Sequence, residues 1–144
     1  MKILALNGPN LDRLGQREPE VYGSDGLDYI MELLKERGKG LGVIVDCYQS
    51  NEEGRLVSKI AASSEEYDGM IFNPAAYTHT SIALRDALVS SSVPCVEIHL
   101  SNVYAREEFR HKNLTAGVCV GQIMGFGVQS YLLGLEAIVK YLSK

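Results

Sequence analysis

Residues 70–88 read MIFNPAAYTHTSIALRDAL, and this stretch contains the pattern that decides the fold. Its first three residues, Met70 to Phe72, form a short apolar run without alternation, which is typical of a strand buried on both faces of a sheet. Apolar residues then recur from Ile82 to Leu88 at helical spacing, and a hydroxyl at 80 or 81 can cap the first turn. The stretch therefore predicts one strand followed by one helix.

The same unit recurs along the whole chain. Further apolar runs predict strands at 3–6, 43–45, 95–98 and 118–120, and apolar residues at helical spacing predict helices at 27–34, 56–61 and 128–142. Strands that alternate with helices in this way are typical of a parallel sheet covered on both faces. We expect a single α/β domain over residues 1–144, a flavodoxin-like three-layer doubly wound fold with a five-stranded parallel sheet in the order 2-1-3-4-5.

The composition narrows the possible functions. The chain has 144 residues, of which 46% are hydrophobic and 22% charged, and its net charge is −4. No run of Lys and Arg is present, which argues against a nucleic-acid partner, and no apolar stretch approaches the roughly 18 residues of a membrane span. The first residues also lack the apolar core of a secretory signal. The three cysteines lie in apolar runs, which predicts buried free thiols and a cytoplasmic location.

One connection is much longer than the others. From Gly8 to about Asp25 the sequence has neither helical nor strand periodicity, whereas loops in α/β units usually have about 2–6 residues. The segment carries Arg17 and Tyr22. It follows the first strand, at the edge of the sheet where α/β domains bind ligands. We interpret it as a lid, with a floppy insertion as the alternative.

Polar side chains follow the predicted strands, and the carboxyl ends of parallel strands meet at one edge of a sheet. The set is rich in amides, hydroxyls and imidazoles and poor in acids, which suits a small polyhydroxylated ligand bound by hydrogen bonds rather than by a metal. Its members are Asn7, Asn10, Gln49, Ser50, Asn51, Asn73, Tyr77, His79, His99, Ser101 and Asn102.

Three side chains in this region are candidates for chemistry. A spacing of two places Glu97 and His99 on the same face of a strand, where the carboxylate can orient or charge the imidazole; a structural histidine is the alternative. His79 either contacts a ligand or caps a helix. Tyr22 shares its loop with Arg17, and a phenol can act as a base where a cation favours the phenolate, although simple packing is the alternative.

Other features leave alternatives open or argue against particular classes. Arg106 and Arg110 would share a face if their segment is helical, and they fit either a surface salt bridge or a clamp for anionic groups. A receiver domain needs aspartates where this chain has Asn7 and Asn73, and no Gly-x-Ser-x-Gly elbow of a hydrolase is present. The glycines of residues 121–127 follow the last predicted strand, so we assign them to close packing rather than to dinucleotide binding.

Several segments together resemble the type II 3-dehydroquinate dehydratases, over nearly the whole chain. In order they are NGPNL (7–11), LGQREP (14–19), YG (22–23), QSNEEG (49–54), NP (73–74), YTHTS (77–81), RDA (85–87), EIHLSN (97–102) and AREEFR (105–110). The resemblance implies reversible anti elimination of water from 3-dehydroquinate to give 3-dehydroshikimate through an enolate. It implies no metal and no cofactor, and a role in the shikimate pathway or in quinate catabolism. It also implies a homo-oligomer, a dodecamer built as a tetramer of trimers.

The resemblance implies a role for each of five catalytic residues. Tyr22 would be the base, as a tyrosinate held in that state by Arg17. Asn10 would hold a water that stabilises the enolate. His99, oriented by Glu97, would protonate the leaving hydroxyl. An elimination beside a ketone needs a base, an enolate stabiliser and an acid, and these roles supply all three.

The resemblance also implies a set of substrate-binding residues. The backbone amides of Leu100 and Ser101 would take the carboxylate, ring hydroxyls would be held by three side chains, and one aspartate would reach into a neighbouring subunit's site. The side chains concerned are Asn73, His79, Arg110 and, across the interface, Asp86. Ala75 stands where glycine is frequent in the family, so we expect the backbone to approach the substrate more tightly at this position. Asp12, Tyr104 and Ser130 are further departures from the family pattern. A competing interpretation is a doubly wound regulatory module that binds a small anion or a nucleotide.

Overall fold

Five parallel strands form one sheet in the order β2-β1-β3-β4-β5 in the computed structural model, which describes residues 1–16 and 26–144. This is the order that the sequence predicts, and the fold is flavodoxin-like. The strands are β1 (Lys2–Asn7), β2 (Ile44–Gln49), β3 (Gly69–Asn73), β4 (Cys95–His99) and β5 (Gly121–Met124).

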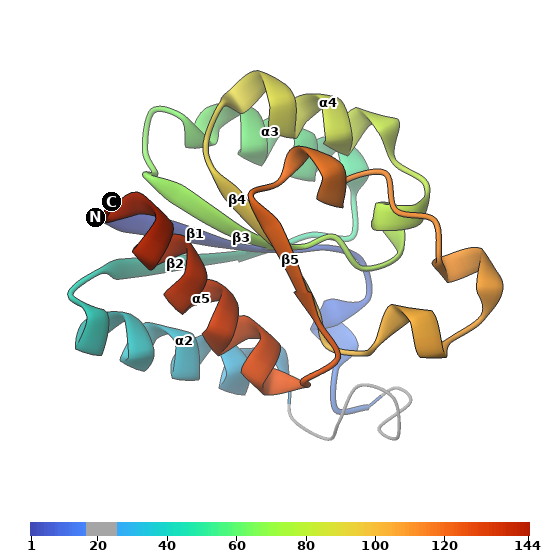
Figure 1. Ribbon diagram of the computed structural model, residues 1–144, viewed down its shortest axis with the longest axis horizontal. Coiled ribbons are helices and arrows are strands. Elements are labelled where there is room, and N and C mark those ends of the chain that lie inside the picture. Colours follow the sequence, from blue (N-terminus) through green and yellow to red (C-terminus); the bar gives the residue numbers. More distant parts are fainter. Residues whose placement is uncertain (17–25) are drawn as a thin grey trace.

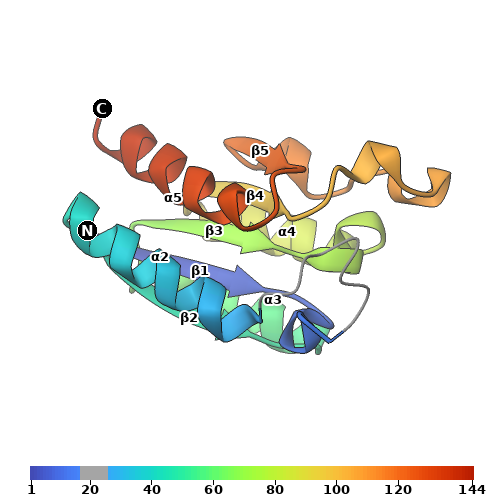
Figure 2. The same ribbon diagram turned by 90° about the horizontal axis from the view of Figure 1, so that it is seen from below.

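Helices cover both faces of the sheet, so the domain has three layers (Figures 1 and 2). On one face lie α2 (Leu27–Leu41) and α5 (Val128–Leu142), and on the other α3 (Glu53–Ser63) and α4 (Ile82–Ser91). Each of the four predicted helices is therefore present. Ser81 is the cap that begins α4, because its Oγ accepts a hydrogen bond of 2.9 Å from the Leu84 amide.

The central strands supply apolar side chains to both layers, as their unalternating sequences predict. In β1, Ile3 and Ala5 belong to the core under α2 and α5, whereas Leu4 and Leu6 belong to the core under α3 and α4. All four side chains are buried. A strand with apolar residues at successive positions can satisfy both cores only when it lies in the middle of the sheet.

The fifth strand differs from the prediction. Residues 118–120 are not a strand: Val118 ends the short turn η5 (Ala116–Val118), and β5 begins at Gly121. The half-buried side chains of Val118 and Cys119 instead pack against the core under α3 and α4, which explains their apolar character. As an edge strand, β5 is only partly buried, so its own sequence carries little apolar signal. The glycine-containing stretch 121–127 therefore includes the last strand instead of following it.

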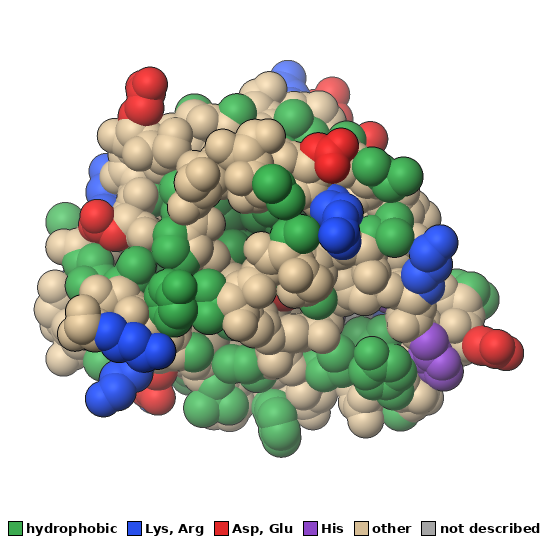
Figure 3. All heavy atoms as spheres, turned by 45° about the horizontal axis from the view of Figure 1, so that its top comes forward, with side chains coloured by type: hydrophobic (Ala, Val, Ile, Leu, Met, Phe, Trp, Pro, Cys, Tyr) green, Lys and Arg blue, Asp and Glu red, His purple; other side chains and the backbone are tan. Residues whose placement is uncertain are grey.

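On the face drawn in Figure 3, Lys and Arg are interspersed with Asp and Glu rather than gathered into one basic patch. In the part of the chain that the structure describes, no helix has the length and apolar character needed to cross a bilayer. All three cysteines are free thiols, but only Cys95 is buried, so the expectation of buried thiols is wrong for Cys47 and Cys119, which are partly exposed.

Candidate active site

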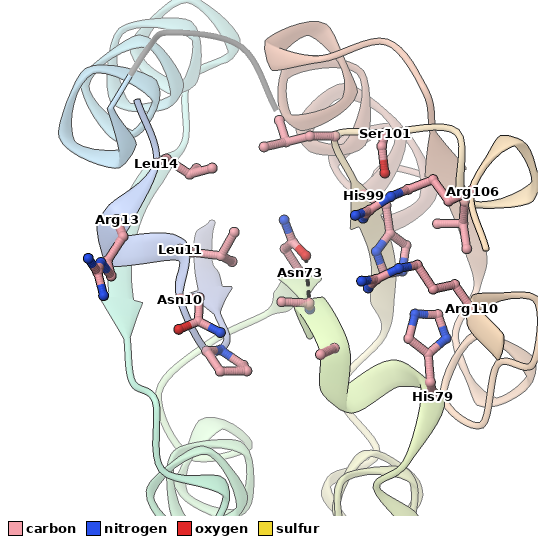
Figure 4. A pocket seen from close by; sticks show the side chains of 15 residues that line it. Asn10, Leu11, Arg13, Leu14, Asn73, His79, His99, Ser101, Arg106 and Arg110 are labelled. Atoms are coloured by element: carbon pink, nitrogen blue, oxygen red, sulfur yellow. Dashed lines mark hydrogen bonds between the residues drawn. The ribbon is translucent and has the colours of Figure 1, made fainter. Parts of the chain in front are cut away.

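A cleft opens at the carboxyl edge of the sheet, between the loops that follow β1, β3 and β4. In Figure 4, Asn73 lies between Asn10 on one side and His99 and Arg110 on the other. Most of the residues expected at the site line this cleft: Asn10, Asn73, Ala75, His79, His99, Leu100, Ser101 and Arg110.

The lining is rich in cationic and potentially cationic groups. Arg13, Arg106 and Arg110 contribute guanidinium groups and His79 and His99 contribute imidazoles, while none of the described lining residues is Asp or Glu. Arginine and imidazole nitrogens donate hydrogen bonds to carboxylate and hydroxyl oxygens. The cleft is therefore suited to a small anionic ligand that also carries hydroxyl groups.

His99 and Glu97 are paired at the end of β4, as their spacing in the strand indicates. The imidazole Nε2 donates a hydrogen bond of 2.8 Å to Glu97 Oε2, and the Glu97 side chain is fully buried. Burial by itself raises the pKa of Glu97, but hydrogen bonds from His99, Thr115 and Asn113 outweigh it and lower the pKa. The carboxylate is thus ionised at neutral pH and can only accept. It holds a proton on His99 Nε2 and leaves Nδ1 as the ring nitrogen for a ligand.

His79 ends the short turn η2 (Ala75–His79) and lines the cleft next to Arg110, below it in the view of Figure 4. Its Nδ1 donates a hydrogen bond of 2.7 Å to the Lys112 carbonyl, which leaves Nε2 for a ligand. Burial lowers the pKa of His79, partly offset by that carbonyl, so the ring is neutral at pH 7 and Nε2 can accept from a hydroxyl. Ser81, rather than His79, caps the start of helix α4, so the interpretation of His79 as a helix cap is wrong.

Asn73 is held from behind by a buried tyrosine of α5. The Asn73 Nδ2 donates a hydrogen bond of 2.9 Å to the Tyr131 hydroxyl, which in turn donates one of 2.7 Å to Asn7 Oδ1. The Asn73 Oδ1 accepts from the Ala75 amide at 3.0 Å. Asn73 therefore keeps one N–H for a ligand. Tyr131 is a site residue that the sequence reasoning missed, because it lies in the apolar stripe of α5 and is indistinguishable there from core.

Two non-glycine residues in the cleft have left-handed backbone conformations. Asn10 has φ 67° and its amide is anchored to Asn51 Oδ1 at 2.9 Å, while Ala75 has φ 53°. Asn tolerates this region, whereas it costs alanine about 1–2 kcal/mol. The positive φ of Ala75 explains why a glycine suits its position. The loops themselves meet closely, because a side chain at Gly8 would lie 2.5 Å from the Pro74 carbonyl oxygen.

Arg106 and Arg110 both line the cleft but do not share a helical face. Their segment forms two short turns, η3 (Val103–Ala105) and η4 (Glu108–Arg110), instead of one helix. The Glu107 carboxylate accepts from Arg110 Nε at 3.0 Å and lies 3.8 Å from Arg106 Nε. Both alternatives for these arginines are therefore confirmed in part: the two side chains are paired with a surface acid, and both also line the cleft.

Two of the expected site residues that the structure describes do not line the cleft. Glu97 lies behind it, and Asp86 is exposed on α4. Arg17 and Tyr22 lie outside the described residues. The long connection begins with the short turn η1 (Leu11–Arg13), which the sequence did not predict, and its residues 17–25 lie outside the described part. The described residues also contain no group of three or more His, Cys, Asp or Glu that could hold a metal ion.

Comparison with known proteins gives consistent results along the whole chain. A family model described as dehydroquinase class II matches residues 1–139. The 3-dehydroquinate dehydratase of Geotalea daltonii is 54% identical over 144 residues, all of both chains, and that of Trichodesmium erythraeum is 57% identical over 97% of this chain and 93% of its own. The crystal structure of type II dehydroquinase from Butyrivibrio crossotus superposes with a TM-score of 0.93 at 44% identity, covering 100% of this chain and 98% of its own.

Proposed function

Because this chain belongs to the class II dehydroquinase family, we infer that it is a 3-dehydroquinate dehydratase, a hydro-lyase that forms 3-dehydroshikimate. The observation in the structure that best supports this activity is the buried Glu97–His99 pair, which opens onto a cleft lined by arginine and histidine. Such a cleft suits a carboxylate ligand with several hydroxyls, and the pair supplies a proton donor beside it.

His99 is the acid in the proposed reaction. A base removes a proton from the carbon beside the ring ketone, and the electron pair moves to the ketone oxygen to give an enolate. When the enolate collapses, a double bond forms, the ring C–O bond breaks, and the leaving hydroxyl takes a proton from His99 Nδ1 and departs as water. The ionised carboxylate of Glu97 stabilises the imidazolium that must carry this proton.

The base and the enolate stabiliser are assigned from the family resemblance. Tyr22 would act as tyrosinate beside Arg17, and both residues lie outside the described part of the chain. Asn10 would hold the water that donates to the enolate oxygen. Asn10 lines the cleft on the side opposite His99 in Figure 4, so the proposed enolate stabiliser and the proposed acid lie on opposite sides of the cleft.

The remaining groups of the cleft bind substrate in this proposal. The carboxylate of 3-dehydroquinate lies at the backbone amides of Leu100 and Ser101. Ring hydroxyls are held by Arg110, by the free N–H of Asn73 and by the neutral His79, whose Nε2 accepts. Ala75 lies beside this set with its amide turned to Asn73.

Assembly and location complete the proposal. We propose a dodecamer, a tetramer of trimers, in which Asp86 reaches a neighbouring subunit's site. The exposure of Asp86 on α4, away from its own cleft, supports this assignment. We also propose a cytoplasmic location, supported by three free thiols, which persist in a reducing compartment. In this proposal the dehydration of 3-dehydroquinate serves either aromatic biosynthesis or quinate breakdown.

The activity is tested by the absorbance of the conjugated enone after 3-dehydroquinate is added to the purified protein. We expect turnover by the wild type and a kcat lower by about 10²–10⁴-fold in His99→Asn, the usual contribution of a general acid. The matched control is His111→Asn at an exposed histidine, which should stay within about twofold of the wild type. A folded wild type that forms no enone, and instead binds a nucleotide, would favour the regulatory-module interpretation.

A further inference from the structure

The carboxylate of Glu97 is surrounded by hydrogen-bond donors from three parts of the fold. Besides the imidazole of His99, four described side chains lie within hydrogen-bonding distance of it, and the hydroxyls of Thr78 and Thr115 also contact each other at 2.6 Å. Glu97 Oε2 contacts Thr78 Oγ1 at 3.0 Å, Asn113 Nδ2 at 2.6 Å and Gln122 Nε2 at 3.0 Å, and Glu97 Oε1 contacts Thr115 Oγ1. Four of these five contacts are to Oε2 and one is to Oε1, so the donors are concentrated on the oxygen that also contacts His99.

The charge of these donors determines how strongly Glu97 can stabilise the proposed acid, His99. Of the five, only His99 can carry a positive charge; the others are two hydroxyls and two amides. Neutral donors stabilise the buried anion without cancelling its charge. The negative charge of the carboxylate therefore remains available to stabilise the imidazolium form of His99.

The side chain of Gln122 contacts Glu97 through its Nε2, and this is the one hydrogen bond that it makes to another described side chain. It stands on β5 directly opposite Glu97 in the parallel register, and it does not line the cleft. Its Nε2 can only donate and the carboxylate can only accept, so the orientation of the amide is defined. Asn113, in contrast, also accepts from the amides of Thr115 at 2.8 Å and Ala116 at 2.7 Å, so its loss would disturb the loop.

We propose that Gln122 is a positioning residue for the dehydration, acting through Glu97 on His99. Together with the hydroxyl of Thr115 it keeps the carboxylate ionised and fixed, so that His99 holds its Nε2 proton toward Glu97 and presents Nδ1 to the leaving hydroxyl. The inference rests on the proposed function, because it assigns the support of the proposed acid. The carboxylate is thus fixed from the edge strand as well as from its own strand.

The test uses Gln122→Met, which removes the donor but keeps the length of the side chain, in the full-length wild-type background. We expect kcat to fall by about tenfold, the factor that corresponds to one lost hydrogen bond to a charged group, with KM changed by less than about twofold. The acid limb of the kcat–pH profile should move to higher pH, because a carboxylate with fewer donors is protonated more easily. Gln129→Met, the same change at an exposed position, should leave kcat and the profile unchanged.

A second pair of variants repeats the test at the other carboxylate oxygen. Thr115→Val removes the hydroxyl at nearly constant shape and should move the acid limb to higher pH, whereas Thr115→Ser keeps the hydroxyl and should restore the wild-type profile. Equal profiles for the Val and Ser variants, or a Gln122→Met enzyme that loses kcat uniformly at every pH, would overturn the proposal. A wild type that forms no enone would instead refute the proposed function, so the two failures are distinguishable.

Discussion

The hydroxyl of Tyr131 connects the ends of two central strands, and its removal in Tyr131→Phe should destabilise the protein substantially. The hydroxyl donates to Asn7 Oδ1 and accepts from Asn73 Nδ2, and the three side chains are at most 3% exposed. Burial raises the pKa of Tyr131 above its usual value, so the hydroxyl keeps its proton and remains a donor. The substitution removes one oxygen atom and leaves the ring in place.

The magnitude follows from the two groups that lose their partner. The Asn7 Oδ1 and one N–H of Asn73 are left without a partner in the protein, and each such buried group costs about 1–3 kcal/mol. With some relaxation of the two amides, we expect a loss of about 2–4 kcal/mol in the free energy of unfolding. For a chain of this length that corresponds to a Tm lower by about 6–12 °C.

The assay is urea and thermal unfolding of the variant and the wild type at equal protein concentration, followed by circular dichroism. Tyr141→Phe is the matched control, because Tyr141 lies on the same helix and is 41% exposed; it should change stability by less than about 0.5 kcal/mol. If Tyr131→Phe is no less stable than Tyr141→Phe, the hydrogen bonds of the Tyr131 hydroxyl to Asn7 and Asn73 do not stabilise the strand ends, and the reasoning is refuted.

Three further predictions concern stability and reactivity. Because the fold lowers the pKa of Glu97, the contribution of this carboxylate to stability is present above the ordinary glutamate pKa of about 4.3 and is lost as the pH falls through the pKa of the folded state. Urea titrations below about pH 4.3 should therefore show that the free energy of unfolding falls more steeply with acidification for the wild type than for Glu97→Gln. Equal slopes for the two proteins would contradict this. Ala75→Gly should raise stability by about 0.5–1 kcal/mol, since relief of the left-handed strain exceeds the added chain entropy, and a lower Tm would argue against strain at Ala75. Burial raises the pKa of Cys47 to about 11, so iodoacetamide should alkylate it at pH 8 on the order of 100-fold more slowly than free cysteine, as followed by mass spectrometry; similar rates would show that the thiol is not so protected.

The sequence was most informative where burial is two-sided. In β1 and β3 nearly every residue is apolar because both faces are covered, so the runs at 3–6 and 70–72 predict strands within a residue or two of their observed ends. The edge strand β5 is only partly buried and contains Gly121 and Gln122, so it has neither an apolar run nor alternation to reveal it. The apolar residues just before it belong to the packing of η5.

The site was predictable where a residue's neighbours lie in its own strand or motif. The contact between Glu97 and His99 follows from a spacing of two in one strand. The residues that support this pair cannot be predicted from spacing in the sequence. Thr78, Thr115 and Gln122 come from separate parts of the chain and meet only in the folded protein. Thr115 and Gln122 lie outside the motifs that carry the family resemblance, and the motif that contains Thr78 does not reveal its contact with Glu97.

The separate roles of base and acid are tested most directly by proton exchange in D₂O with the His99→Ala variant. 3-Dehydroquinate is incubated with the variant, recovered, and examined by NMR for deuterium at the carbon beside the ketone, while the enone absorbance reports elimination. We expect exchange to continue, because Tyr22 and Asn10 still form the enolate, while elimination falls by at least about 10²-fold. Loss of exchange together with elimination, or elimination at the wild-type rate, would contradict the assignment of His99 as the acid alone.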